Sequence, residues 1–235
     1  MSRRDSPRRR ADGDRTARAR IRDAAIERFA SQGFSATSLK DVAADAGVSA
    51  PLVLHHFGSK GDLRAACDKH VASLIRQQKS EGMAAGPGAD PFETLRGTYE
   101  GTSIFRYVAR ALAEGSPHLD DLVDMMIEDA LVYMADGVER GVLRPVENLR
   151  EQVVVLSVWQ LGALAMNHHL KRLLGIDLVD GTGDSLVRWA QLSSRILAKG
   201  VINEDVYDKL TAGTKADERS SGTAEDPRPT EQEVS

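Results

Sequence analysis

Arginine side chains gather at the start of this 235-residue chain, where they could neutralise the phosphate groups of a polyanion. Residues 1–76 carry 15 Lys and Arg against 9 Asp and Glu, whereas the remaining residues carry 16 against 26. The basic part therefore suits nucleic acid, and the acidic part suits small molecules, other proteins or a second copy of the chain. The alternative is that the Arg-rich start is only a solvated tail.

Hydroxyl and imidazole groups follow at positions that suit contacts with phosphates. Ser38 and Asp41 have the Ser-x-x-Asp spacing of a helix cap, and Ser49 can cap a further helix. Helix starts of this kind direct backbone N–H groups at anions. His55 and His56 are adjacent, so their side chains point about 100° apart on a helix, which disfavours a metal site made by both. Either histidine could instead be packed or solvated.

Catalytic chemistry is not indicated. The chain has no Gly-x-Ser-x-Gly elbow, His-Glu-x-x-His, phosphate-binding Gly loop or zinc-spaced Cys/His set, and the GTG near Thr182 lacks a strand and a further glycine. Asp121, Asp124 and Glu128 share one helical face, but a solvated face is favoured over a metal site. Cys67 is the only cysteine, so an intramolecular disulfide is excluded. For its thiol we favour an inert, buried role over a role as an oxidant sensor. We therefore expect no enzyme, no cofactor and no metal.

The elements that position these side chains are helices. Only 5% of the residues are aromatic, and the runs between Gly and Pro are rich in Ala, Leu, Arg, Glu and Asp, so we predict an all-α fold. Apolar residues recur at helical spacing before Gly33 and again before Gly47, and Val53 and Phe57 lie four apart in a third segment. Two helices around a short Gly-containing turn have the layout of a helix-turn-helix, whose second helix enters the major groove of DNA. The alternative is that the hairpin is a plain packing unit.

The helix that would read bases is unusually apolar, because it begins Ala50-Pro51-Leu52-Val53-Leu54. Its side chains offer mainly van der Waals contacts. In the major groove such contacts favour the methyl group of thymine.

The run AAIERFASQGFSATSLKDVAADAGVSAPLVLHHFGSKGDLRAAC resembles the N-terminal DNA-binding domain of the TetR family of transcriptional regulators, over roughly residues 18–75. The resemblance implies an all-helical homodimer whose C-terminal domain forms the dimer and binds a small organic ligand that weakens DNA binding. Two positions depart from the family pattern, because Leu54 is commonly tyrosine and Leu52 is commonly polar.

The residues expected to contact DNA combine the matched family positions with two arginines before the motif. We hypothesise that the arginine arm offsets the few polar groups of the reading helix by lying along phosphates or entering a minor groove, with Arg8 to Arg10 as further candidates. The predicted set is Arg15, Arg18, Thr37, Ser38, Ser49, Ala50, Pro51, Leu52, Leu54, His55, His56 and Lys60.

The domain organisation follows from these segments. We predict a disordered arm over 1–14, a helix-turn-helix domain over 15–60, a linking helix over 61–80, a regulatory and dimerisation domain over 81–211 and a disordered tail over 212–235. Pro91 and Pro117 suit first helical positions. The resemblance implies that helices over about 148–174 and 184–199 form the homodimer, although the first could also be the central helix of a monomer.

A ligand pocket is implied by the resemblance alone. The large or polarisable side chains of the C-terminal helices suit an organic molecule, although the same residues would serve equally as core. They are Phe105, Arg106, Tyr107, Met125, Met126, Tyr133, Trp159 and Met166.

The function expected from all these features is a sequence-specific transcriptional regulator, a repressor that a small ligand releases from a near-palindromic operator on double-stranded DNA. The alternatives are a ligand-independent or activating regulator and a helical protein-interaction module. The longest apolar run, Val153 to Met166, is shorter than a membrane span, and the N-terminus lacks an apolar signal region, so we expect a cytoplasmic protein with no membrane partner.

Overall fold

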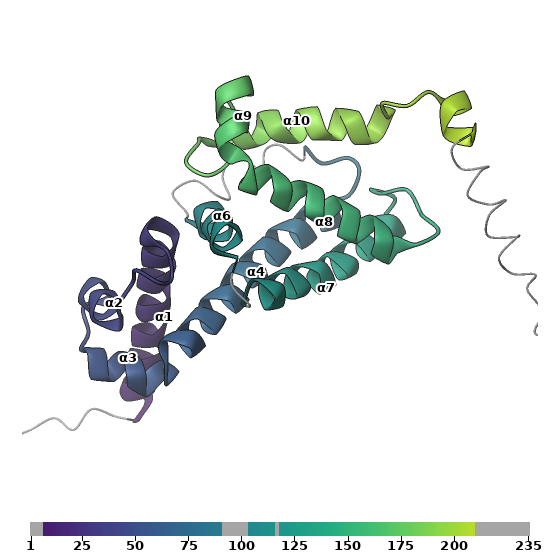
Figure 1. The fold of residues 1–235 in the computed structure, drawn as a ribbon. Coiled ribbons are helices and arrows are strands. Elements are labelled where there is room, and N and C mark those ends of the chain that lie inside the picture. The colour runs from purple at the N-terminus through teal and green to yellow at the C-terminus, as the bar shows by residue number, and fades with distance from the viewer. Residues whose placement is uncertain (1–6, 91–102, 116–117, 210–235) are drawn as a thin grey trace, which may run out of the picture. The chain divides into compact units, whose positions relative to one another are not determined.

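The computed structural model describes residues 7–90, 103–115 and 118–209, with side chains from Arg15 onward. These residues form helices and no strand, as the predicted all-α fold requires (Figure 1). The helices are α1 (Pro7–Gln32), α2 (Leu39–Ala46), α3 (Ala50–Phe57), α4 (Lys60–Ala84), α6 (Ile104–Glu114), α7 (His118–Glu139), α8 (Leu149–Ala165), α9 (Asn167–Leu174) and α10 (Gly183–Lys199).

The chain divides into two compact units, Met1–Trp189 and Ala190–Ser235. The first unit contains α1 to α9 and the first turns of α10. In the second unit, α10 ends at Lys199, and residues 201–209 are exposed.

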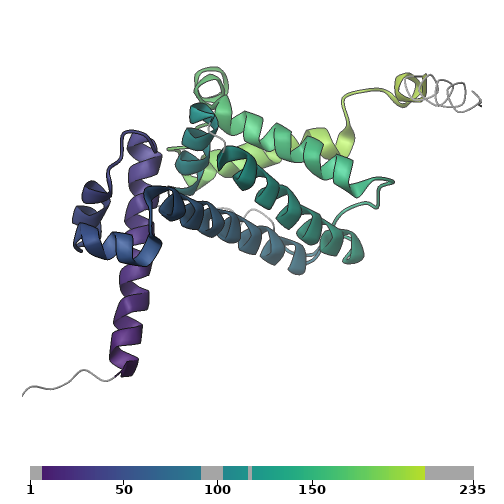
Figure 2. The ribbon, with the colours of Figure 1, turned by 60° about the horizontal axis from the view of Figure 1, so that its bottom comes forward.

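Helix α1 begins earlier than the sequence predicted. Its first residue is Pro7, whereas we expected the helix to start near residue 15. Proline suits the first helical position, and the three arginines that follow are good helix formers. The N-terminal half of α1 extends beyond α2 and α3 (Figure 2). The rest of the predicted disordered arm, residues 1–6, lies outside the described residues.

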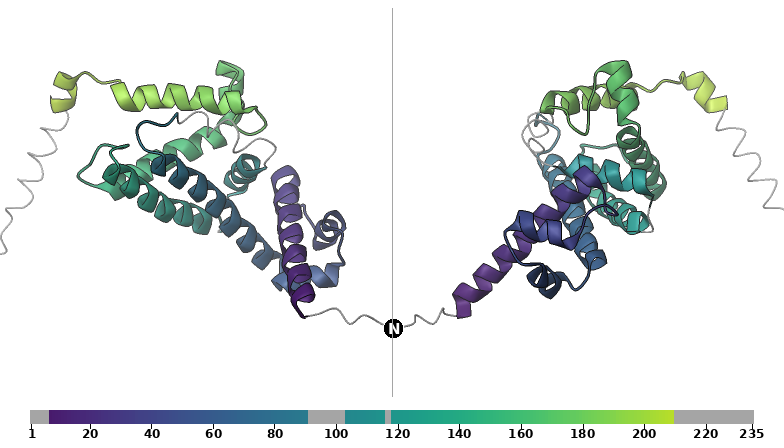
Figure 3. Two further views of the ribbon diagram at one scale, coloured as in Figure 1. Left: turned by 180° about the vertical axis from the view of Figure 1, so that it is seen from behind. Right: turned by 60° about the vertical axis from the view of Figure 1, so that its left-hand side comes forward.

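One apolar core joins the helix-turn-helix to the helices that follow it. Its members from α1 to α3 include Ile21, Phe29, Val42, Val53 and Phe57, all buried as the helical spacing predicted. Further members of this core come from α4, α6 and α7. Helices α4 and α7 pack along each other, as Figure 3 shows from behind. The helix-turn-helix therefore does not form a separate body within the first unit.

The predicted long helix over 148–174 is wrong, because α8 and α9 meet at a break at Met166 and are bent by 72°. The amide of Asn167 explains the break: its Nδ2 donates to Asp177 Oδ1 at 3.0 Å, and its Oδ1 accepts from the Leu178 N–H at 2.8 Å. These bonds fasten the start of α9 to the segment before α10. In the described part of the chain no single helix is long and apolar enough to cross a membrane, and only the bent α8 and α9 pair has the length and composition for it.

The remaining predicted bounds shift or fall outside the described residues. The linking helix predicted over 61–80 is α4, which runs from Lys60 to Ala84, and α10 begins one residue before its predicted start. Pro91, Pro117 and the predicted tail over 212–235 lie outside the described residues.

Candidate DNA interface

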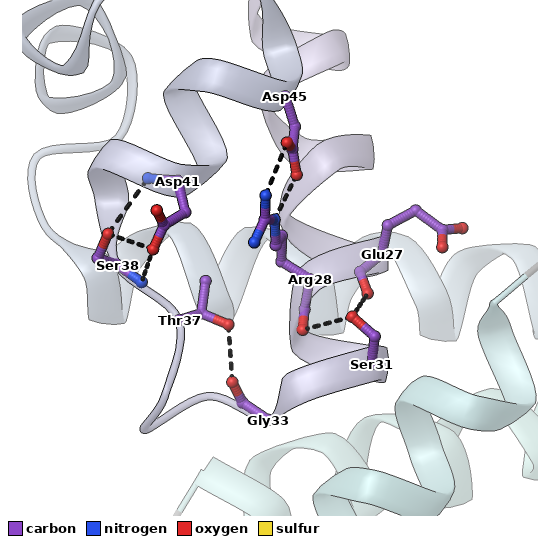
Figure 4. A network of polar contacts seen from close by, with 8 residues as sticks. All are labelled: Glu27, Arg28, Ser31, Gly33, Thr37, Ser38, Asp41 and Asp45. Atoms are coloured by element: carbon purple, nitrogen blue, oxygen red, sulfur yellow. Dashed lines mark hydrogen bonds and ion pairs between the residues drawn. The ribbon is translucent and has the colours of Figure 1, made fainter.

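The turn into α2 is built by short-range hydrogen bonds, which Figure 4 shows from close by. The Ser38 side chain accepts from the Asp41 N–H at 3.2 Å, and the Asp41 carboxylate accepts from the Ser38 N–H at 3.3 Å, so the predicted cap is a full capping box. Thr37 is buried, and its hydroxyl donates to the Gly33 carbonyl at 2.8 Å. Ser38 therefore stays exposed at the start of α2, whereas the Thr37 side chain is turned inward.

An ion pair fixes α2 against α1. The guanidinium of Arg28 donates to both carboxylate oxygens of Asp45, with Nη2 to Oδ1 at 2.8 Å (Figure 4). This hydrogen bonding lowers the pKa of Asp45, although both groups lie at the surface. Gly47 ends α2 in the left-handed region, with φ of 64°, and the chain turns there into α3.

Helix α3 has an inward and an outward face. Val53 and Phe57 are buried, whereas Pro51, Leu54 and His55 are exposed. Ala50, Leu52 and His56 are half-buried between the two faces, and Ser49 lies exposed before the helix. The outward face therefore presents two apolar side chains and one imidazole.

Two predicted cations lie against aromatic rings. The Arg18 guanidinium lies 4.9 Å from the ring centroid of Phe57, so α1 places an exposed positive charge beside the end of α3. The Lys60 ammonium lies 4.3 Å from the Phe34 ring, and burial lowers the pKa of Lys60. Arg15 is exposed one turn before Arg18 on α1. Seven of the residues predicted to contact DNA are therefore exposed on or beside α1, α2 and α3. They are Arg15, Arg18, Ser38, Ser49, Pro51, Leu54 and His55.

Residues of α4 and α6 contact the helix-turn-helix on the side away from the reading helix. These contacts were not predicted from the sequence. The Glu114 carboxylate, at the end of α6, accepts from the Phe34 N–H at 3.0 Å. Arg110 Nη2 donates to the Gln32 carbonyl at 2.9 Å. Arg64 is buried on α4, with Nη1 3.9 Å from Glu114 Oε2. Helix α6 therefore holds the end of α1 and the turn before α2, through contacts between residues about 80 positions apart.

The predicted ligand-lining residues do not gather around one cavity. Tyr107 is buried and donates from its hydroxyl to Asp68 at 2.5 Å, whereas Arg106 pairs with Asp180 at 2.5 Å. Phe105, Met125 and Met126 pack against the same core as Tyr107. Tyr133 packs in a second apolar cluster. The ring of Trp159 contacts that of Trp189, and Met166 is exposed. A small cavity beside Tyr107, Glu114 and Arg64 measures about 10 Å³, room for about one water molecule.

Cys67 is buried in the core, and burial raises the pKa of its thiol. The neutral thiol is therefore the stable form, which agrees with the inert interpretation.

Comparisons with known proteins match both parts of the chain. The family described as "Bacterial regulatory proteins, tetR family" matches residues 21–67, and "Tetracyclin repressor-like, C-terminal domain" matches residues 100–187. The chain is 39% identical over 148 residues to the HTH-type transcriptional regulatory protein RaaS of Mycobacterium tuberculosis, covering 62% of this chain and 68% of the relative. It is 38% identical over 79 residues to the HTH-type transcriptional regulator AcrR of Shigella flexneri, covering 34% and 36%.

A solved structure shares the fold. A TetR-family transcriptional regulator from Mesorhizobium loti superposes with a TM-score of 0.55 at 16% identity, covering 79% of this chain and 97% of that one. Members of the family are DNA-binding regulators that typically respond to ligands, and they are not enzymes. The match covers more than two thirds of the mycobacterial relative, and two TetR family models match the chain. This chain therefore belongs to the TetR family of transcriptional regulators.

Proposed function

We propose that this regulator binds a near-palindromic operator as a homodimer, represses transcription by excluding polymerase, and is released by a small organic ligand. Its place of action is the cytoplasm, where the operator DNA lies. The outward face of α3 carries this proposal, because Pro51, Leu54 and His55 are exposed on the second helix of the helix-turn-helix, the helix that enters the major groove in this motif.

Phosphate contacts are proposed for the exposed polar groups beside α3. Arg15 and Arg18 lie on α1, and Ser38 and Ser49 precede the starts of α2 and α3. Helix starts and arginines are the groups that bind phosphates in protein–DNA interfaces, where they set the register of the protein on the duplex.

Dimerisation is proposed through α8 and α10, and exposed apolar side chains support it. On α8, Val155 and Val158 lie three residues apart and are 67% and 61% exposed. On α10, Leu192 and Ile196 lie four residues apart and are exposed. Each pair forms an apolar stripe of the kind that marks a protein–protein contact. Two copies would supply two reading helices for the two half-sites of an operator.

Release by a ligand is proposed through α6. Phe105, Tyr107, Met125 and Met126 lie in or against the core that α4, α6 and α7 share. A ligand inserted there would displace α6, and α6 holds the Gly33 and Phe34 turn through Glu114. The ligand would thereby favour an orientation of the helix-turn-helix that no longer fits both half-sites.

Selection of bound genomic fragments by the purified protein, at two salt concentrations, tests the proposal. We expect one near-palindromic site to be enriched at both concentrations. Salt-sensitive binding with no enriched site would contradict it, because phosphate contacts alone give affinity without specificity. A thermal-shift screen of metabolites tests the ligand, and a stabilising compound must also release the selected site.

A further inference from the structure

We propose that Leu54 reads the C5 methyl group of a thymine in each operator half-site, so that an apolar contact specifies this base. The inference rests on the proposed function, because it requires α3 to lie in the major groove. It adds which side chain of the apolar helix makes the discrimination and which base it selects.

Leu54 differs in its exposure from the other large apolar side chains of the DNA-binding helices. Its side chain is 47% exposed, and among residues 15–90 it is the one large hydrophobic side chain that is exposed. Leu52 is half-buried, and Val53 is fully buried in the core. Of the apolar residues that begin α3, Leu54 is therefore the one that can reach a base edge with a large side chain.

The neighbours of Leu54 extend the apolar surface. Pro51 is exposed and lies three residues earlier, on the same side of the helix. Half-buried Ala50 lies four residues before Leu54. Pro51, Ala50 and Leu54 together form an apolar ridge on the outward face. His55 is the exposed polar neighbour, and it points about 100° away from Leu54 around the helix.

Backbone donors do not replace the missing side-chain donors along this ridge. Pro51 has no N–H. The N–H groups of Leu52 and Val53 both donate to the Ser49 carbonyl, at 3.0 and 3.3 Å. The Pro51, Leu52 and Val53 backbone therefore offers no N–H donor to the bases that the ridge covers.

The chemistry of the major groove then selects the base. Guanine, adenine and cytosine present acceptors or donors there, whereas thymine also presents a methyl group. A leucine pressed against an acceptor or donor removes water from it without offering a new bond, which costs free energy. A leucine pressed against the thymine methyl buries apolar surface on both sides. Thymine is therefore the base that the ridge favours.

The test removes and restores a single methyl group in the selected operator. Each thymine is replaced in turn by deoxyuridine, which lacks only the C5 methyl. We expect one position in each half-site to bind about fourfold more weakly, the factor for one buried carbon group. At that position, 5-methylcytosine is expected to bind about fourfold more tightly than cytosine.

Protein variants assign the effect to Leu54. In the Leu54→Ala variant we expect thymine and deoxyuridine operators to bind equally well. Val132→Ala is the control, because Val132 is an aliphatic side chain that is 67% exposed on α7, outside the residues proposed to contact DNA, and this variant should keep the fourfold difference. Thermal unfolding of both variants checks that the helix-turn-helix remains folded.

The outcomes separate this inference from the proposed function. No enriched operator would overturn both. An enriched operator whose thymines can all become deoxyuridine without loss would overturn the methyl contact alone. A thymine preference that persists in Leu54→Ala would overturn the role of Leu54 and assign the methyl to another side chain.

Discussion

The carboxylate of Glu114 accepts a hydrogen bond from the backbone N–H of Phe34 at 3.0 Å, although the two residues are 80 positions apart in the sequence. Glu114 ends α6, and Phe34 lies in the turn between α1 and α2. Gly33 makes this approach possible, because it has φ of +87° and a Cβ built there would lie 2.0 Å from Glu114 Oε1. Helix α6 and the DNA-binding motif are thus joined at a glycine where an added Cβ would displace the Glu114 carboxylate.

Gly33→Ala is expected to destabilise the protein by about 3–4 kcal/mol. Alanine would have to adopt a left-handed conformation, which costs about 1–2 kcal/mol, and Glu114 would have to retreat and lose its charged hydrogen bond. Urea unfolding of the two proteins measures the difference.

Gly47→Ala provides the matched control for this substitution. Gly47 also has positive φ, at 64°, but a Cβ added to it would meet no atom within 4 Å. The control should therefore lose only the conformational part, about 1–2 kcal/mol. Equal losses in the two variants would show that the approach of Glu114 contributes nothing.

Glu114→Ala is expected to lower stability by about 1–3 kcal/mol and to weaken operator binding. The substitution leaves the Phe34 N–H without its acceptor and removes the carboxylate that lies 3.9 Å from buried Arg64. Glu114→Gln retains an acceptor and should lose less. If operator affinity in Glu114→Ala equals that of the wild type, α6 does not orient the reading helix.

The helix-turn-helix could be predicted from the sequence because its signals are local. The Ser38 and Asp41 cap, the Gly47 that ends the helix and the four-residue spacing of Val53 and Phe57 all act within one or two turns. Each of these features appears in the structure as the sequence predicted.

The features that were missed depend on partners far along the chain. No local pattern pairs Glu114 with Phe34, and the break at Met166 depends on Asp177, which holds Asn167 across the start of α9. Thr37 looked like a phosphate contact by its position, but its hydroxyl serves the Gly33 carbonyl. A hydroxyl that completes a turn cannot be distinguished from an exposed one until the packing around it is known.

Asp177 is expected to make stability depend on pH. Burial alone would raise its pKa, but hydrogen bonds from the Asp180 N–H, Lys171, Asn167 and the Val179 N–H outweigh burial and hold the pKa well below its usual range. A carboxyl group whose pKa is lowered by folding stabilises the protein above its unfolded pKa of about 3.9, and this contribution is lost as the pH falls below it. Wild type should therefore lose more stability than Asp177→Asn between about pH 5 and pH 2.

Unfolding by urea at several pH values measures this difference. Other carboxylates titrate in both proteins, so the gap between wild type and variant isolates Asp177. The gap should be about 1–3 kcal/mol at pH 7 and should narrow in acid. A gap that stays constant from pH 7 to pH 3 would contradict the assignment.

Arg18→Gln is expected to weaken binding to all DNA sequences about equally. If Arg18 neutralises one phosphate, its loss should make the slope of log K against log salt shallower by about 0.9. Arg140→Gln is the control, because Arg140 pairs with Asp136 on α7. Gel shifts at four salt concentrations measure the slopes. An unchanged slope in Arg18→Gln would remove this residue from the interface.

The stripe on α8 is expected to hold two copies together. Val155→Glu combined with Val158→Glu places two charges where each valine is more than 60% exposed, so the monomer should remain folded. Burying those charges in a dimer contact would be costly, so light scattering should report a monomer for the variant and is expected to report a dimer for the wild type. Val132→Glu is the matched control, since Val132 is also 67% exposed but lies on α7. A charged α8 stripe that still yields dimers would place the contact elsewhere, and a dimer lost only in the Val132 variant would assign it to α7.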